Sequence, residues 1–285
     1  MDNFITLTSD ASLDLFPDNR IGAFRVKLPH PIVVDHTKFQ IGLYSVNFPN
    51  KLPNVVDGCF KVRAVADSRE TTIVGPNGES VTMIQGRGHV ETKEREIANG
   101  YYSSPQQLID CINEQIYTTQ FRDENLQFCD PSTEFVKFEY DQTTEKASLV
   151  SNGSPDCDIR IQLSTDLFIK LGFGLTESER RFIRAPLTAP HTVDLGAGHN
   201  SIFLYTDIVK KNRIVGGQIT DLLAVIPIIG GHNTNCHHAP NVIEYRDLRY
   251  DKIEEINIVL AGDTGEILPF QSGKVILTLH IREKF

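Results

Sequence analysis

The segment KVILTLHIR, residues 274–282, alternates between two kinds of side chain at every second position. One face carries Val275, Leu277, Leu279 and Ile281, and the other carries Lys274, Ile276, Thr278, His280 and Arg282. A period of two predicts a β-strand with one face on a hydrophobic core. Three further runs, residues 201–209, 221–229 and 252–260, are β-rich and have almost no helical periodicity. The C-terminal region therefore predicts four strands.

The N-terminal third also predicts strands and turns. In FRVKLP, residues 24–29, apolar side chains alternate until the proline, which has no N–H for a strand ladder. In FQIGLYSVNF, residues 39–48, the alternation changes phase, which predicts a β-bulge near Gly42–Tyr44. CFKVRAVA, residues 59–66, and the pair ETTIV and SVTMI predict further strands, and Pro76-Asn77-Gly78 predicts the hairpin turn between the pair.

The middle third contains the two helices that the sequence predicts. YYSSPQQLIDCINEQI, residues 101–116, offers Ser104 as a cap, Pro105 at the first helical position and an apolar stripe at helical spacing. The stripe consists of Leu108, Ile109, Ile112 and Ile116. STDLFIKLGFG, residues 164–174, predicts a short helix capped by Ser164 and ended by Gly172. With the alternating runs between them, these helices predict a compact α+β unit.

The order β, then α+β, then β predicts a mainly β fold class. Repeated β–helix–β units are not seen in the sequence, which argues against a parallel doubly wound sheet. Neither β segment has enough strands to close a sandwich alone, so we expect both to form one antiparallel β-sandwich, a single jelly roll. The expected domains are residues 1–89 with 190–285 for the jelly roll, and residues 90–189 for an inserted α+β domain.

Composition and charge limit the possible partners. The 285 residues are 40% hydrophobic and 23% charged, with a net charge of −9, as in an ordinary globular protein. The longest apolar run, LLAVIPII at residues 222–229, is interrupted by Pro227 and is too short for a membrane span. The N-terminal MDNFITLTSD has no basic segment before an apolar core, so we expect no secretory signal.

Direct binding to nucleic acid is not expected either. A phosphate-binding protein normally has a basic face, whereas the densest basic cluster here, Arg180, Arg181 and Arg184, is interleaved with Glu177 and Glu179. We interpret this segment as a solvated turn of mixed charge. The sequence therefore does not support genome packaging through this chain.

The cysteines indicate a reducing environment. The chain has five, which is an odd number, and they are scattered without a CxxC pair: Cys59, Cys111, Cys129, Cys157 and Cys236. Such a set is typical of intracellular proteins with free thiols. We therefore expect the protein to fold and assemble in the cytoplasm of a cell.

One cluster has the residue types of a metal site. His232, Cys236, His237 and His238 could supply imidazole and thiolate ligands. A structural site needs four converging ligands, however, and three consecutive residues in extended backbone point apart. The surrounding asparagine, glycine and proline predict a flexible loop. We therefore expect no metal and no other cofactor.

Three further motifs suggest chemistry that the sequence does not support. Gly86-Arg87-Gly88 is too short for a phosphate cradle and precedes no capped helix, so a bend is expected. Asp263-Thr264-Gly265 resembles an aspartic-protease triplet but occurs once, between strand-like runs, which predicts a hairpin turn. Asp207 lies in an apolar strand, where a hydrogen-bonded or interface role is expected. We predict no catalytic residues and no enzyme activity.

Several segments, in order along the chain, resemble the penton, or minor capsid, proteins of Maverick/Polinton elements and the related virophages. The segments are FPDN (16–19), FRVKLPHPIVV (24–34), FQIGLYSVNFPNKLPNV (39–55), IANGYYSSPQQLIDCIN (97–113), IQLSTDLFIKLGF (161–173), LYTDIV (204–209), IVGGQITDLLAVIPI (214–228) and DTGEILPFQSGKVILTLHIRE (263–283). The set covers most of the chain. It departs from the family pattern at Gly217, where an acidic residue is common, and at Ala224, where an arginine is common.

The resemblance implies a structural protein of a virion. It implies homopentameric pentons at the fivefold vertices of an icosahedral shell, beside trimers of a separate double-jelly-roll major capsid protein. The alternative is a β-sandwich attachment or carbohydrate-binding protein. The sequence weakens that alternative because it has no tryptophan and only 8% aromatic residues, whereas sugar-binding platforms generally use exposed aromatic faces.

Overall fold

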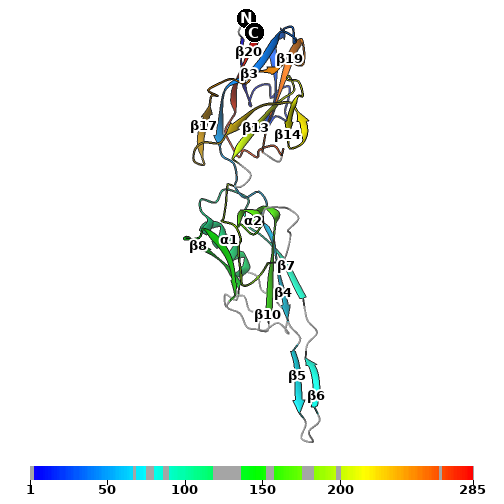
Figure 1. Ribbon diagram of the computed structural model, residues 1–285, viewed down its shortest axis with the longest axis vertical. Helices are drawn as coiled ribbons and strands as arrows, with labels where there is room; N and C mark the ends of the chain where they lie inside the picture. Colours follow the sequence, from blue (N-terminus) through cyan, green and yellow to red (C-terminus); the bar gives the residue numbers. More distant parts are fainter. Residues whose placement is uncertain are drawn as a thin grey trace. The chain divides into compact units, whose positions relative to one another are not determined.

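The protein is mainly β, as the sequence predicts, and its sheets are antiparallel (Figure 1). The computed structural model describes residues 3–66, 69–74, 80–85, 90–117, 136–151, 157–174, 183–196, 200–262 and 265–284. The chain divides into two compact units. Unit 1 combines Met1–Pro53 with Gly198–Phe285, and unit 2 is Asn54–Ala197.

Unit 1 contains two main sheets. The first has the order β1 (Asn3–Thr8), β20 (Ile276–Glu283), β3 (Phe39–Asn50) and β17 (Thr234–His238), with β18 (Arg246–Asp247) also on β3. The second has the order β16 (Leu222–Pro227), β13 (Ser201–Thr206), β19 (Lys252–Ala261) and β2 (Ala23–Val33). A separate hairpin joins β14 (Arg213–Val215) to β15 (Gln218–Thr220).

One hydrophobic core holds the two sheets of unit 1 together. The predicted inward face of β20 is correct, because Leu277, Leu279 and Ile281 are fully buried. They share this core with side chains from the second sheet, including Leu204 of β13 and Ile258 of β19. Two antiparallel sheets around a common core form a β-sandwich.

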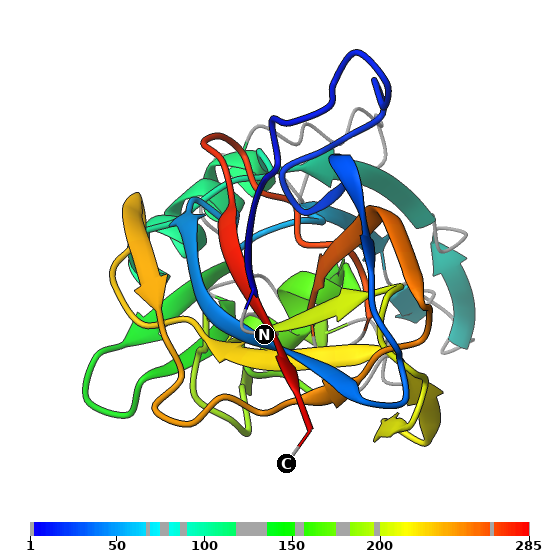
Figure 2. The same ribbon diagram turned by 90° about the horizontal axis from the view of Figure 1, so that it is seen from above.

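The strands of the sandwich pair in a nested order. The first strand, β1, pairs with the last, β20, and β2 pairs with β19. Further inward along the chain, β3 pairs with β17 and β13 pairs with β16. Figure 2 shows β20 in red beside the dark-blue β1, with the N- and C-terminal ends of the chain close together.

The predicted β-bulge in β3 is present. Thr278 pairs with Ser45 and Leu279 pairs with Leu43, so Tyr44 is the extra residue on the β3 side. The neighbouring Gly42 has no room for a side chain, because a Cβ there would lie 2.4 Å from Cγ2 of Ile243. The phase change in the sequence therefore marks a real irregularity in the strand.

Unit 2 contains two small sheets and the two predicted helices. One sheet has the order β11 (Ile183–Arg184), β10 (Cys157–Leu163), β4 (Cys59–Ala66) and β7 (Val90–Glu96). The other has the order β12 (Leu187–Thr188), β9 (Lys146–Ser151) and β8 (Val136–Asp141). A hairpin pairs β5 (Arg69–Val74) with β6 (Ser80–Gln85), and its predicted turn at residues 76–78 lies outside the described residues.

The helices are α1 (Pro105–Tyr117) and α2 (Thr165–Lys170). As predicted, the Ser104 hydroxyl accepts a hydrogen bond from the N–H of Gln107, and the stripe from Leu108 to Ile116 is buried in the core of unit 2. Ser164 caps α2 by accepting from the N–H of Leu167. No helix among the described residues is both long enough and apolar enough to cross a membrane.

The boundary between the two units differs from the predicted one. The sequence-based boundary at residue 90 assigns β4 to the sandwich, but β4 pairs with β7 on one side and with β10 on the other. Unit 2 therefore begins at Asn54 and ends at Ala197, not at residues 90 and 189. Alternating side chains identify β4 as a strand but do not specify its partners.

A buried ion pair fixes the beginning of unit 2. Nζ of Lys170 lies 2.7 Å from Oδ1 of Asp166, and the side chains are only 4% and 14% exposed. Oδ2 of Asp166 accepts hydrogen bonds from the N–H groups of Val56 and Asp57. The C-terminal end of α2 is fixed as well, because the carbonyl of Lys170 accepts from the N–H of Asp194.

Substituting Lys170→Met should destabilise unit 2 by about 3 kcal/mol, because Asp166 keeps its buried charge and loses its counter-ion. The matched control is Lys61→Met, which removes the more exposed ion pair with Glu94 and should cost much less stability. Urea unfolding followed by circular dichroism measures both. Equal stabilities of the two variants would contradict the buried-pair argument.

Replacing Asn54–Ala197 by a Gly/Ser linker should leave unit 1 folded, because both of its main sheets lie outside this segment. Replacing only residues 90–189 should give a poorly folded protein, because β4 then loses both of its partners. Far-UV circular dichroism and the cooperativity of thermal unfolding distinguish the two deletions. If the variant that lacks residues 90–189 unfolds cooperatively at the same temperature as the variant that lacks Asn54–Ala197, the boundary at Asn54 is wrong.

Candidate functional site

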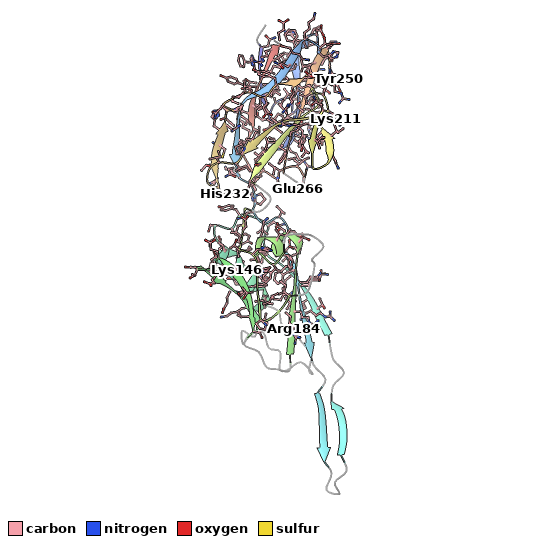
Figure 3. All side chains as sticks on the ribbon, viewed as in Figure 1. Lys146, Arg184, Lys211, His232, Tyr250 and Glu266 are labelled. Carbon is pink, nitrogen blue, oxygen red and sulfur yellow. The ribbon has the colours of Figure 1, made fainter. Side chains whose placement is uncertain are left out.

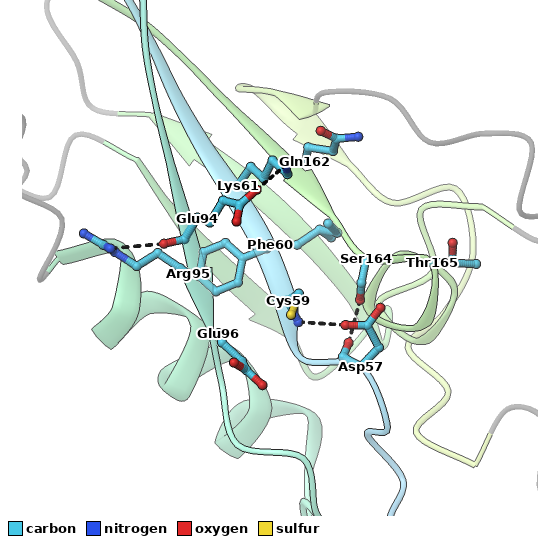
Figure 4. Close-up of a pocket in the computed structure, with 11 residues that line it drawn as sticks. Asp57, Cys59, Phe60, Lys61, Glu94, Arg95, Glu96, Gln162, Ser164 and Thr165 are labelled. Carbon is cyan, nitrogen blue, oxygen red and sulfur yellow. Dashed lines mark hydrogen bonds and ion pairs between the residues drawn. The ribbon is translucent and has the colours of Figure 1, made fainter.

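A polar hollow of about 530 Å³ opens on unit 2 (Figure 4). Strands β4 and β7 and the corner between β10 and α2 form its walls, and its lining includes Asp57, Cys59, Lys61, Glu94 and Ser164. Most of these groups already have partners within the fold. Cys59 donates its N–H to Asp57, Ser164 donates its hydroxyl to the carbonyl of Asp57, and Lys61 pairs with Glu94.

The thiol in this hollow has a raised pKa. Partial desolvation raises the pKa of Cys59, and a hydrogen bond to Asp57 and the charges of Asp57, Glu96 and Glu94 raise it further. A reactive cysteine needs the opposite environment, one that stabilises the thiolate. No histidine stands among the described lining residues to act as a base. The arrangement does not provide the chemistry of a cysteine enzyme.

The predicted loop with His232, Cys236, His237 and His238 is wrong in part, because the last three residues belong to β17. Strand geometry sends consecutive side chains to opposite faces. Cys236 is buried and its thiol donates to the carbonyl of Ile229, whereas His237 is exposed and bonds Asn47. His232 precedes the strand (Figure 3). The segment forms a strand because its backbone hydrogen-bonds to the edge of β3.

A different group has the residue types of a cation site. Ligand atoms of Asp35, His36 and Asp251 lie within 4.8 Å of one another. Hydrogen bonds within the group account for this arrangement. Asp251 accepts from the N–H of His36 and lies 2.6 Å from its Nδ1, and Asp35 accepts from Thr37. The two acids are exposed, so the group is an ordinary surface contact between two segments of the chain.

Asp207 follows β13 and is hydrogen-bonded, as predicted. Its Oδ1 accepts from the N–H of Asn257 on the neighbouring β19. Burial raises the pKa of the Asp207 carboxyl, the hydrogen bond from Asn257 lowers it, and the charges of Glu255 and Asp221 raise it further. The net result is a raised pKa for Asp207, which lies near the carboxylates of Glu255 and Asp221 at this end of the second sheet.

The two departures from the family pattern fall on the β14–β15 hairpin and on β16. Gly216 and Gly217 form the hairpin turn with φ of +54° and +85°, which is a conformation that glycine adopts at little cost. Ala224 lies in β16 and packs against the edge of the core. Three predicted features, Gly86-Arg87-Gly88, the first two residues of Asp263-Thr264-Gly265, and Arg180 with Arg181, lie outside the described residues.

The outer face of the first sheet carries an aromatic cluster that the sequence analysis missed. The Phe4 ring stacks on His280 at 4.5 Å and meets Tyr44 edge-on at 5.0 Å. The Tyr245 hydroxyl lies 2.7 Å from Nδ1 of His280, and the Arg282 guanidinium lies 3.6 Å from the centre of the Tyr245 ring. Phe4 is 57% exposed and Tyr44 is 47% exposed. We call these five residues the aromatic cluster.

The four longer strands of the sheet that bears the aromatic cluster are almost free of charge. Strands β1, β3 and β17 contain no Asp, Glu, Lys or Arg, β20 contains only Arg282 and Glu283 at its end, and the remaining charges of the sheet are Arg246 and Asp247 on the short β18. In the chain as a whole, 23% of residues are charged. Protein interfaces are depleted in charged residues at their centre and enriched in aromatic ones. The composition of this face therefore matches that of an interface.

No family model matches the chain, and no curated protein matches its sequence. Among solved structures, the crystal structure of the mavirus penton protein is similar to this chain. The similarity covers 100% of both chains, with a TM-score of 0.49 and 12% sequence identity. At this level the similarity carries no inference about this chain and identifies no site residues.

Substituting Asp207→Asn should stabilise unit 1 at pH 7. The pKa of Asp207 is raised in the folded state, so its charged form costs stability at neutral pH, and this cost disappears as the pH falls through the raised pKa. The advantage of Asp207→Asn should therefore shrink on acidification. Thermal unfolding across a pH series measures this trend.

The control for this pH series has the opposite sign. The pKa of Asp10 is lowered, mainly by a hydrogen bond from Thr8, so Asp10→Asn should lose stability at pH 7 and approach the wild type in acid. A stability difference for Asp207→Asn that does not change with pH would contradict the raised pKa.

Proposed function

We propose that this chain is a structural capsid protein that forms homopentameric pentons at the fivefold vertices of an icosahedral viral shell. Its sandwich is a single jelly roll, and unit 2 is the domain inserted into it. Its partners are four further copies of itself and trimers of a double-jelly-roll major capsid protein. It assembles in the host cytoplasm, becomes part of the virion and catalyses no reaction.

The nested strand pairing of unit 1 carries this proposal. A jelly roll arises when one long antiparallel hairpin wraps into two facing sheets, so that the first of eight strands pairs with the eighth, the second with the seventh, and so on inward. The pairs β1–β20, β2–β19, β3–β17 and β13–β16 follow that order. Viral capsid proteins are prominent among jelly rolls, although lectins and cupins share the fold.

The quoted sequence motifs fall on the strands that build this order, which supports the capsid reading. LYTDIV begins in β13, IVGGQITDLLAVIPI covers β14, β15 and β16, and the last motif ends in β20. IQLSTDLFIKLGF joins the end of β10 to α2 in unit 2. The resemblance therefore includes both units and follows the order of their elements along the chain.

The chemistry of the described side chains supports an assembly role more than catalysis. The polar groups of the hollow in unit 2 bond one another, and the pKa of its thiol is raised. Cys236 and His237 point to opposite sides of β17. By contrast, the aromatic cluster lies exposed on a nearly uncharged sheet. That feature also suits the carbohydrate-binding alternative, so binding to a glycan array separates the two functions.

The purified chain should form pentamers, alone or once the major capsid protein is added. Each subunit has a net charge of −9, so subunits repel one another at long range. Salt at physiological concentration limits the range of this repulsion to a screening length of ~8–10 Å, so added salt should strengthen the ring. Light scattering across a salt series measures the mass. A stable trimer would indicate a different capsid role, and a monomer that stays out of reconstituted shells would contradict the vertex assignment.

A further inference from the structure

The outer faces of the two sheets in unit 1 differ in a way that suits contact between copies. The first sheet has the aromatic cluster and only two formal charges in its four longer strands, with Arg246 and Asp247 on the short β18 at one side. On the second sheet, the charges lie on β2 and β19, and the adjacent β13 and β16 have none. Each sheet therefore has an uncharged area, and the two areas lie on opposite sheets of one sandwich.

The uncharged area of the second sheet presents apolar side chains outward. Phe203 of β13 pairs with Val225 of β16, and Tyr205 of β13 pairs with Val259 of β19. Their neighbours Ile202 and Leu204 point into the core instead and are fully buried. Val225 is 42% exposed. We call Phe203, Tyr205, Val225 and Val259 the apolar row.

We propose that the aromatic cluster of one copy packs against the apolar row of the next copy, and that this contact, repeated, closes the ring. The proposal rests on the pentameric function above and names the surface that carries it. Because the two surfaces are different, the contact is heterologous, and a heterologous contact generates rings when the rotation closes. A contact between two identical faces would give a dimer.

Charge explains why a second copy is the fitting occupant. Two chains of net charge −9 repel each other, so they can meet closely only where charged groups are few. The aromatic cluster also contributes the Arg282 cation, and the apolar row ends near the carboxylates of Asp207, Asp221 and Glu255. Arg282 of one copy would lie near the acidic side chains of the next copy, and this attraction determines which faces meet.

The area is of the right order for a stable contact. With a rise of ~3.3 Å per residue and strands ~4.8 Å apart, the four longer strands of the first sheet cover roughly 500 Å². A standard interface buries about 800 Å² on each partner, so the strand face supplies more than half and adjoining loops supply the rest. The stacked Phe4 and His280 are already held in place, which reduces the entropy lost on binding.

Two single substitutions test the contact, and both positions are exposed enough to leave the fold intact. Phe4→Glu disrupts the aromatic cluster, and Val225→Glu disrupts the apolar row. Under the condition at which the wild type assembles, each variant should associate at least about tenfold more weakly. The matched control is Ile214→Glu on the β14–β15 hairpin, 73% exposed, which should assemble like the wild type. Tyr44→Glu is a second variant of the aromatic cluster.

Mixing the two variants tests the pairing itself. Each copy of Phe4→Glu keeps an intact apolar row, and each copy of Val225→Glu keeps an intact aromatic cluster. An equimolar mixture should therefore form heterodimers and stop there, which native mass spectrometry detects directly. Dimers of Val225→Glu alone would indicate a contact between two aromatic clusters and would overturn the heterologous pairing.

The remaining outcomes separate the contact from the function. Pentamers of both variants would overturn the proposed contact and leave the vertex function standing. Loss of assembly in Ile214→Glu but not in the two face variants would locate the contact on the hairpin instead. A wild-type chain that stays monomeric at every concentration, with or without the major capsid protein, would overturn the contact together with the pentamer. Circular dichroism confirms that each variant is folded.

Discussion

The pairing of β1 with β20 determines the architecture of unit 1, because it joins the two ends of the chain in one sheet. β20 lies between β1 and β3, so both of its edges are hydrogen-bonded, and its inward side chains Leu277, Leu279 and Ile281 are fully buried. These contacts join residues that lie at opposite ends of the chain. The entropic cost of closing a loop grows slowly with loop length. The whole of unit 2 can therefore lie in sequence between the two halves of the sandwich with little additional loss of stability.

Local features of this fold could be predicted from the sequence because their causes are local. The alternation in β20, the phase change at Tyr44 and the capped stripe of α1 each depend on neighbouring residues. Strand pairing depends on residues far apart. β4 alternates like a strand of the sandwich but pairs with β7 and β10. Likewise, β17 has the sequence TNCHH, and the available edge of β3, not its own β-propensity, makes it a strand.

The candidate surface shows the same limit. Phe4, Tyr44 and His280 lie far apart in the sequence, and no local sequence pattern relates them. The register of β1 on β20 places Phe4 directly opposite His280, and the bulge in β3 frees Tyr44 from the ladder, so that its ring reaches Phe4. The absence of charge from β3 is visible in the sequence, but its meaning depends on β1, β20 and β17 lying in the same sheet.

A face of this composition can be stable in water and also stable when covered. Its centre is uncharged but polar, with the hydroxyls of Thr6 and Thr278 bonded to each other across β1 and β20 at 3.2 Å. Burying a lysine or a glutamate requires removing water from a full charge, whereas burying a bonded hydroxyl or an aromatic ring costs far less. An outer sheet face that keeps its polar groups paired within the subunit therefore favours association without making the isolated subunit insoluble.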